Sequence, residues 1–380
     1  MAMSSREFDL VVYGATGFVG RQAVAHLTAH APRDLRWAVA GRDATRLAAL
    51  GAPVPALVAD ATAPGELAAL AGRTRVVVSF AGPFALYGDL LVEACIAAGT
   101  HYCDISGDLA RIRRLIDRHD AAARAAHVRI VPFAGLCSLP ADLAVHLLDR
   151  KLDGGLTLAK AILDPGNGTF SGGTVASMID AVDSGDEEGE RDPMLLGPPR
   201  SPDPVERDPR GLRYDRDLRA WVAASPTGLS DTRAVRLSAT LSGRPGLRFQ
   251  EYLAFPGPLG VARTVTTRLL LAVMHAAVRR RPTRALLTRL TPPGAGPSAH
   301  QVENGRLRLR VWGSDASGRT AEVSLLAPGD PGSRVSAIGA CECALLLATR
   351  DAGPHGLITP SVAFGEELAV RLRTAGFTIA

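Results

Sequence analysis

Three glycines near the amino terminus have the spacing of a phosphate-binding loop. Gly14, Gly17 and Gly20 follow an apolar run at residues 8–13 and open a segment with helical periodicity. A glycine-rich turn between a strand and a helix brings backbone N–H groups and the positive end of the helix dipole to a pyrophosphate. We therefore predict a dinucleotide site here, in which Gly14 allows the tight turn, Gly17 admits the pyrophosphate and Gly20 lets helix and strand pack closely. The other loop residues assigned to this site are Ala15, Thr16, Phe18 and Val19.

The end of the second predicted strand, residues 35–40, indicates which dinucleotide binds. Gly41 and Arg42 follow that strand, and Arg42 lies 22 residues after Gly20. An acidic residue at this place would bind the 2′-hydroxyl of NAD, whereas an arginine suits the 2′-phosphate of NADP by charge and fork geometry. We predict NADPH as the cofactor. Asp60 either contacts the adenine or caps a helix.

A turn of small residues follows the predicted strand at residues 75–80. Such a turn at the carboxyl end of a strand lets the chain pass close to a nicotinamide. We assign Ala81, Gly82, Pro83 and Phe84 to the cofactor site. The pattern contains no cluster with metal-ligand spacing, and we predict no metal.

Alternating apolar and helical segments over the first half predict an α/β domain. The predicted strands are residues 8–13, 35–40, 54–58, 75–80, 101–104 and 128–133. The predicted helices are residues 17–30, 45–50, 65–71, 89–98 and 109–126. Short buried strands separated by helices form a doubly wound parallel sheet with right-handed crossovers.

The pattern changes after Pro140, which predicts a second, α+β domain with an antiparallel sheet. Helices are predicted at residues 139–152, 174–184, 335–350 and 360–375, and strands at 156–163, 233–241, 306–312 and 320–325. Alternating Arg and apolar residues at 306–312 predict a hairpin with one wet face, on which Glu322 opposes an arginine. The Pro-rich residues 185–211 are predicted to form a mobile lid, because they offer few apolar side chains for burial.

The expected domains are a Rossmann domain at residues 1–140, a substrate and dimerisation domain at 141–345, and C-terminal helices at 346–380 that pack back on the first domain. At 380 residues, two domains are expected from length alone. A net charge of +5 with 38 acidic residues indicates a mixed solvated surface and no nucleic-acid partner. Five cysteines without a pairing pattern indicate a reduced cytoplasmic protein. The sequence leaves open whether the protein forms a homodimer. The basic, apolar residues 259–281 leave open a contact with a membrane surface, although no binding is expected.

Several motifs together resemble the saccharopine-dehydrogenase-like oxidoreductases, and among them the trans-acting enoyl reductases of polyketide and phenolic-glycolipid pathways. The motifs are residues 14–20, 40–42, 81–88, 102–108, 135–142, 171–174, 290–298 and 357–360. The resemblance implies NADPH-dependent reduction of an enoyl thioester or a related double bond on a carrier. The chain departs from the family where Cys137 replaces an aspartate. A non-redox tailoring enzyme such as a cyclase, or an NADP-binding partner of a synthase, is the alternative.

Enoyl reduction requires a proton source and hydrogen-bond donors for the thioester oxygen. Tyr87 and Tyr102 are the candidate catalytic residues, because both lie near carboxyl ends of predicted strands. The candidate substrate-binding residues are Cys137, Ser171, Gly172, Gly173 and Thr174. The two glycine amides begin a predicted helix and could hold an enolate or a phosphopantetheine group.

Overall fold

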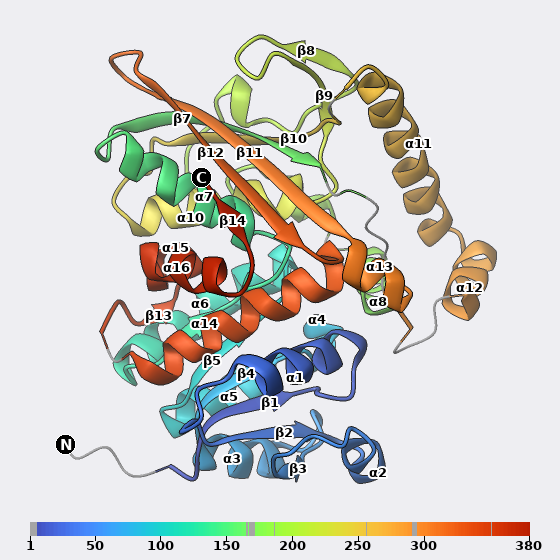
Figure 1. Cartoon of the computed structure of the whole chain (residues 1–380), viewed down its shortest axis with the longest axis vertical. Helices are drawn as coiled ribbons and strands as arrows, with labels where there is room; N and C mark the ends of the chain where they lie inside the picture. Colours follow the sequence, from blue (N-terminus) through green and yellow to red (C-terminus); the bar gives the residue numbers. More distant parts are fainter. Residues whose placement is uncertain are drawn as a thin grey trace.

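The computed structural model describes residues 6–164, 166, 172–185, 187–255, 257–290, 295–350 and 352–380. Two sheets of seven strands each dominate these residues (Figure 1). Helices fill the layer between the sheets, and one apolar cluster joins residues of both sheets. The two halves of the chain therefore share a continuous core.

The first sheet is entirely parallel, which confirms the predicted doubly wound domain. Its strands, in spatial order, are β13 (Gly356–Leu357), β6 (Arg129–Val131), β5 (His101–Asp104), β4 (Thr74–Ser79), β1 (Phe8–Tyr13), β2 (Trp37–Gly41) and β3 (Ala56–Val58). All of the predicted strands of this half are present. The sequence pattern missed β13, whose two residues are too few for any periodicity.

Helices cover both faces of the first sheet. One face packs on α1 (Phe18–His30) and α14 (Ser336–Thr349), and the other on α3 (Pro64–Arg73), α5 (Asp89–Ala98) and α6 (Leu109–Ala125). Two short helices, α2 (Ala44–Ala48) and α4 (Phe84–Tyr87), follow β2 and β4. Because α14 comes from the second half of the chain, it connects the first sheet to the layer above.

The second sheet is mixed rather than antiparallel. Its spatial order is β14 (Thr378–Ile379), β12 (Thr320–Pro328), β11 (Arg306–Asp315), β7 (Leu156–Asp164), β10 (Arg248–Leu253), β9 (Ala220–Ala224) and β8 (Arg213–Asp215). The β11–β12 hairpin is confirmed, and Arg310 lies 3.7 Å from Glu322 on its wet face. The central pair β7 and β10 is parallel, which corrects the predicted sheet type.

The remaining helices all follow β6 in the chain. They are α7 (Leu139–Lys151), α8 (Gly172–Ser184), α9 (Glu187–Glu190), η1 (Pro204–Glu206), α10 (Gly228–Leu241), α11 (Gly260–Arg279), α12 (Arg281–Leu290), α13 (Ala299–Asn304), η2 (Pro331–Val335), α15 (Pro360–Phe364) and α16 (Glu366–Thr374). The helix predicted at residues 360–375 is divided at Gly365, where φ is +54° and ψ is −133°. A helix cannot continue through that conformation.

Residues 233–241 were predicted as a strand, and this prediction is wrong because they belong to α10. The helix is buried on almost every side, so no polar face marks its period of 3.6 residues. Its two buried arginines contributed to the wrong prediction, because arginines usually mark an exposed face. Arg233 binds the carboxylate of Asp208, with Nη1–Oδ1 at 2.6 Å, and Arg236 donates to the carbonyl oxygens of Pro193 and Phe249.

The same arginines contact residues 185–211, the segment predicted to form a mobile lid. Among the described residues of that segment, Met194 and Leu196 are buried, so the premise of few buried apolar side chains fails. Arg233 and Arg236 also hold several of its backbone carbonyls. The segment is thus attached to α10 by both packing and hydrogen bonds.

Candidate functional site

The glycine loop lies between the carboxyl ends of β1 and β4 and the first turn of α1. Gly14 has φ +77°, and a Cβ there would lie 2.7 Å from the backbone nitrogen of Ala81. A Cβ on Gly20 would collide with the carbonyl oxygen of Gly14. These two glycines therefore allow the loop, the helix and the β4 turn to pack together.

Gly17 serves a different purpose from Gly14 and Gly20. Its φ is −68°, which any residue adopts, and a Cβ would meet the Gly14 carbonyl oxygen at 3.2 Å. It is the N-cap of α1, and neither a capping side chain nor an acidic residue occupies that first turn. Backbone N–H groups at such a terminus favour a phosphate. The geometry thus fits a pyrophosphate over Gly17.

The second half of the chain reaches over this loop. A Cβ on Gly296 would lie 2.6 Å from the ring of Phe18, at the start of α1. The loop before α13 therefore lies directly on the phosphate-binding turn. The sequence pattern gave no sign of this contact, because the two segments are far apart along the chain.

Arg42 lies in an exposed position directly after β2, beside the glycine loop. It acts electrostatically on Asp60, whose pKa is lowered chiefly by hydrogen bonds from the backbone N–H and the hydroxyl of Thr62. Asp60 thus organises its own turn but does not cap α3 (Pro64–Arg73), whose N-cap is Ala63, so the helix-cap alternative is wrong. Contact of Asp60 with an adenine stays a prediction. Asp43, next to Arg42, caps α2 by accepting from the Arg46 N–H.

Two further guanidinium groups face the glycine loop. Arg21 Nη1 donates to the Thr16 carbonyl oxygen at 2.8 Å, and Arg46 Nη2 donates to the same oxygen at 3.4 Å. Sequence reasoning missed both. The available signal for Arg46 was its place four residues after Arg42, on the helix that follows the discriminating strand. Arg42, Arg46 and the backbone N–H groups of the first turn of α1 together form a basic surface that fits NADP(H).

Residues 81–84 lie at the carboxyl edge of the sheet and lead into α4, which carries Tyr87. The peptide bond between Gly82 and Pro83 is cis. Tyr87 is half-buried and therefore accessible to a ligand. Arg111 packs against this loop, with its guanidinium carbon 5.8 Å from the centre of the Phe84 ring.

Tyr102 does not fit the role of proton donor. Its side chain is fully buried, and its hydroxyl donates to Asp104 Oδ2 at 2.8 Å. Burial and the Asp104 carboxylate raise the pKa of Tyr102 well above its ordinary value. Arg111 pairs with the same carboxylate, with Nη1–Oδ2 at 3.2 Å, and with Asp89, with Nε–Oδ1 at 2.8 Å. Tyr102 thus belongs to a buried network that braces the β4 loop.

Cys137 lies beside Gly107, at the carboxyl end of β5, and close to Ser230. Burial and, to a smaller extent, the charge of Asp231 raise the pKa of the Cys137 thiol to about 12. The thiol therefore stays protonated near neutral pH and is a poor nucleophile. Contact with a substrate remains a prediction for Cys137.

Behind Cys137 lie two buried carboxyl groups. Asp231 Oδ1 accepts from Ser138 Oγ at 3.2 Å and from Ser230 Oγ at 3.2 Å. Glu251 Oε1 accepts from Ser225 Oγ at 2.6 Å and from Thr227 Oγ1 at 2.9 Å. Burial and the proximity of Glu251 raise the pKa of Asp231 well above its usual range, and burial also raises the pKa of Glu251. Burial and mutual repulsion thus disfavour the state in which both carboxyl groups are ionised.

The predicted substrate residues 171–174 are only partly placed. Ser171 lies outside the described residues, and Gly172, Gly173 and Thr174 form the first turn of α8. Helix α8 begins two residues before the predicted start at residue 174, which places the amides of Gly172 and Gly173 at the helix terminus. Their contact with a ligand remains a prediction.

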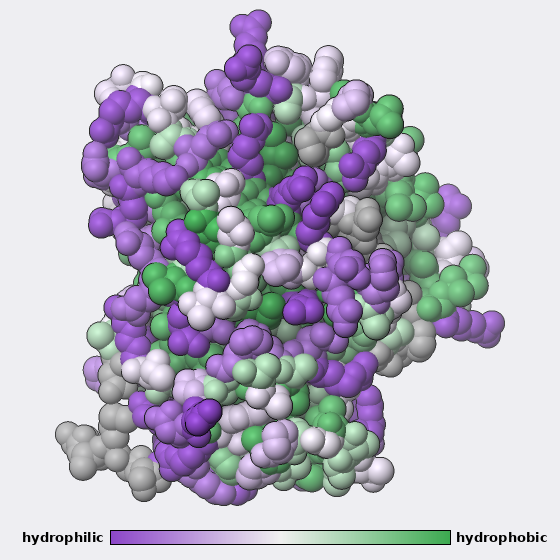
Figure 2. All heavy atoms as spheres, in the orientation of Figure 1, coloured by the Kyte–Doolittle hydropathy of each residue, from purple (hydrophilic) through white to green (hydrophobic). Residues whose placement is uncertain are grey.

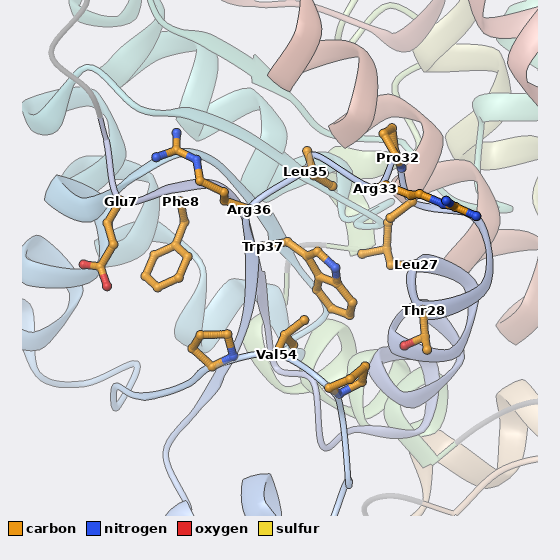
Figure 3. A pocket seen from close by; sticks show the side chains of 13 residues that line it. Glu7, Phe8, Leu27, Thr28, Pro32, Arg33, Leu35, Arg36, Trp37 and Val54 are labelled. Atoms are coloured by element: carbon orange, nitrogen blue, oxygen red, sulfur yellow. The ribbon is translucent and has the colours of Figure 1, made fainter.

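A hollow of about 560 Å³ lies on the opposite side of the first domain (Figure 3). Phe8, Trp37 and Val54 line it, at the amino ends of β1 and β2. Open α/β sheets bind ligands at the carboxyl ends of their strands. The hollow is therefore not the dinucleotide site, which lies at the other edge of the sheet.

Comparison with known proteins agrees with this geometry. The family described as "Saccharopine dehydrogenase NADP binding domain" matches residues 10–131. A Mycobacterium tuberculosis protein named trans-acting enoyl reductase is 34% identical over 412 residues, covering 99% of this chain and 98% of its own length. A Mycobacterium ulcerans protein of the same name is 32% identical over 418 residues, covering 100% of this chain and 99% of its own length.

A solved structure shows the same fold at much lower identity. Apo saccharopine dehydrogenase (L-Glu forming) from Saccharomyces cerevisiae superposes with a TM-score of 0.53 at 12% identity, covering 98% of this chain and 99% of that one. The Rossmann domain and its glycine loop define an NADP-dependent oxidoreductase, with NADPH as the reducing cofactor. The chain belongs to the saccharopine-dehydrogenase-like family that includes the mycobacterial trans-acting enoyl reductases.

Proposed function

We propose that this reductase acts in trans on the carbon–carbon double bond of an enoyl thioester, in a polyketide-type pathway of secondary metabolism. The observation that carries the proposal is similarity over the full length of relatives that bear the name trans-acting enoyl reductase. The similarity includes the second half of the chain, which would contact the substrate. The expected substrate is a small molecule or an acyl group bound to a carrier.

Residues at the carboxyl edge are the candidates for the other requirements of this reaction. NADPH, when bound, supplies a hydride to the β-carbon. Negative charge then develops on the thioester oxygen, and the α-carbon takes up a proton. Tyr87, half-buried on α4, remains the candidate donor, because Tyr102 is committed to Asp104. The Gly172 and Gly173 amides of α8 are the candidate hydrogen-bond donors to the oxygen.

The direct test uses a 2-enoyl thioester of pantetheine and the purified full chain with NADPH. The expected result is loss of NADPH fluorescence, together with a product that has gained two hydrogens by mass spectrometry. Reduction of imine substrates alone would show that the double bond is of a different class. Stable NADPH binding without reduction of enoyl, imine or carbonyl substrates would favour the non-redox alternative.

The two tyrosines provide a matched pair for the catalytic assignment. Tyr87→Phe should lower turnover about 10²–10⁴-fold without loss of NADPH affinity, as expected for removal of a proton donor. Tyr102→Phe should leave turnover near the wild-type rate. Equal turnover of both variants and the wild type would remove Tyr87 from the mechanism, while leaving the reaction class intact.

A further inference from the structure

Helix α11 exposes an apolar face along its length. Val261, Val265, Leu269 and Val273 follow one another at four-residue steps and are 42%, 39%, 63% and 66% exposed. Side chains four residues apart lie on the same side of a helix. The buried residues Gly260, Thr264 and Val278 lie on the side toward the protein. A core helix would bury this apolar face, so it is unpartnered in the isolated chain.

The apolar face continues onto neighbouring elements. Leu286 and Leu290 of α12 are 54% and 69% exposed. Figure 1 shows α11 and α12 at the side of the molecule, with the upper end of α11 beside β9, and Figure 2 shows hydrophobic surface gathered there. We call α11 and α12 together, residues 260–290, the lateral helix pair.

The charge of the lateral helix pair narrows the choice of partner. Residues 252–302 contain seven arginines and neither Asp nor Glu, and all seven lie within the pair. Arg284 pairs with Asp183 of α8, with Nη1–Oδ1 at 2.6 Å, but neither α11 nor α12 contains an acidic residue. Two copies of this chain packed through the pair would therefore bring like charges together. An anionic partner avoids that repulsion.

An aromatic pair extends the surface next to α11. Tyr214 on β8 and Trp221 on β9 are 51% and 48% exposed, with their ring centres 5.8 Å apart. Strand β9 packs against α11. Exposed Trp and Tyr side chains beside an apolar, arginine-flanked helix are typical of surfaces that lie at the level of lipid headgroups.

We propose that the lateral helix pair docks this protein on an anionic lipid surface, with α11 lying in the plane of the interface. Helix α11 has 20 residues and is long and apolar enough to cross a membrane by length and composition. However, it packs on β9, α8 and α12, and Arg263 and Arg268 interrupt its sequence. These features favour a helix that lies on the bilayer over one that spans it. The proposal is independent of the reaction that the site catalyses.

The test is flotation of the full chain with vesicles of phosphatidylcholine, with or without phosphatidylglycerol. The wild type should float with the phosphatidylglycerol vesicles at least tenfold more than with pure phosphatidylcholine, and high salt should weaken this binding. The double variant Leu269→Gln/Val273→Gln should lose at least tenfold of the binding, because both apolar side chains become polar. Val370→Gln, at a 59% exposed position on α16, is the matched control and should bind like the wild type.

Three results would overturn the proposal. The first is an absence of flotation with either vesicle type. The second is equal loss of binding in the double variant and the Val370→Gln control, which would make the effect unspecific. The third is a wild-type dimer by light scattering that becomes a monomer in the double variant, which would assign the face to a second copy of the chain.

Discussion

Two groups of buried carboxyl side chains lie near the carboxyl edge of the first sheet, and they differ in whether a cation accompanies them. Asp104 is paired with the fully buried guanidinium of Arg111. Asp231 and Glu251 face each other and are hydrogen-bonded to hydroxyl groups, without an ion pair in the part of the chain that the structure describes. A low-dielectric interior thus accommodates carboxyl groups in two ways: as a carboxylate neutralised by arginine, or as an acid that keeps a proton.

Asp142 on α7 belongs to the second type. It is buried and accepts from the Ser361 backbone N–H and hydroxyl, both at 2.8 Å, and from the Ser238 hydroxyl. Burial outweighs these hydrogen bonds and raises the pKa of Asp142 to about 6. The comparison therefore predicts different responses to mutation and to pH for Asp104 and Asp142.

The largest effect is expected from removing the cation of the first group. Arg111→Leu leaves Asp104 buried without its counter-charge and should lower the free energy of unfolding by about 3–5 kcal/mol. Urea denaturation measures this loss. Arg113→Leu, two residues away on α6, removes only an exposed pair with Asp117 and should cost less than about 1 kcal/mol. Equal midpoints for the two variants would refute the role assigned to Arg111.

For the second type of carboxyl group, the raised pKa of Asp142 should appear in the pH dependence of the free energy of unfolding. Because the pKa of Asp142 is raised in the folded state, the folded protein binds more protons than the unfolded chain between about pH 4 and 6. The contribution of Asp142 to stability therefore falls as pH rises through that window. Asp142→Asn should remove this dependence, changing the stability difference between variant and wild type by about 3 kcal/mol. Parallel stability profiles from pH 4 to 7 would contradict the raised pKa.

A smaller effect is expected for the tyrosine of the first group. Tyr102→Phe removes one hydrogen bond to the Asp104 carboxylate, but Arg111 stays in place. The free energy of unfolding should fall by about 1.5–3 kcal/mol, the range for hydrogen bonds to charged groups. Thermal unfolding of the Tyr102→Phe and Tyr87→Phe variants compares the two losses of stability. Tyr87→Phe should lower the free energy of unfolding less, because Tyr87 is only half-buried. The opposite order would show that the structural role belongs to Tyr87.

The first sheet and the glycine loop were predictable because their signals are local. Short apolar strands and helices alternate, and Gly14, Gly17 and Gly20 follow β1 within seven residues. The Gly296 contact with Phe18 was not predictable, since it depends on how distant segments meet.

The second half was harder to predict because polar residues enter its core. Strand β10 contains the buried pair Gln250 and Glu251, which hides its apolar period. Helix α10 buries Arg233 and Arg236, which pair with residues that precede it by many positions. Tyr102 was assigned to catalysis for the same reason. Its position at the end of a strand is visible in the sequence, whereas its partners Asp104 and Arg111 are visible only in the fold.

The central claim, that the glycine loop and the basic surface around Arg42 bind NADPH, is tested most directly by fluorescence titration of the wild type with NADPH and NADH. A charge-assisted contact with the 2′-phosphate predicts about ten- to a hundredfold tighter binding of NADPH, and Arg42→Ala should erode this preference. Arg36→Ala, which removes an arginine paired with Asp9 at the opposite edge of the sheet, should keep it. Wild-type protein that binds NADH as tightly as NADPH would contradict the account.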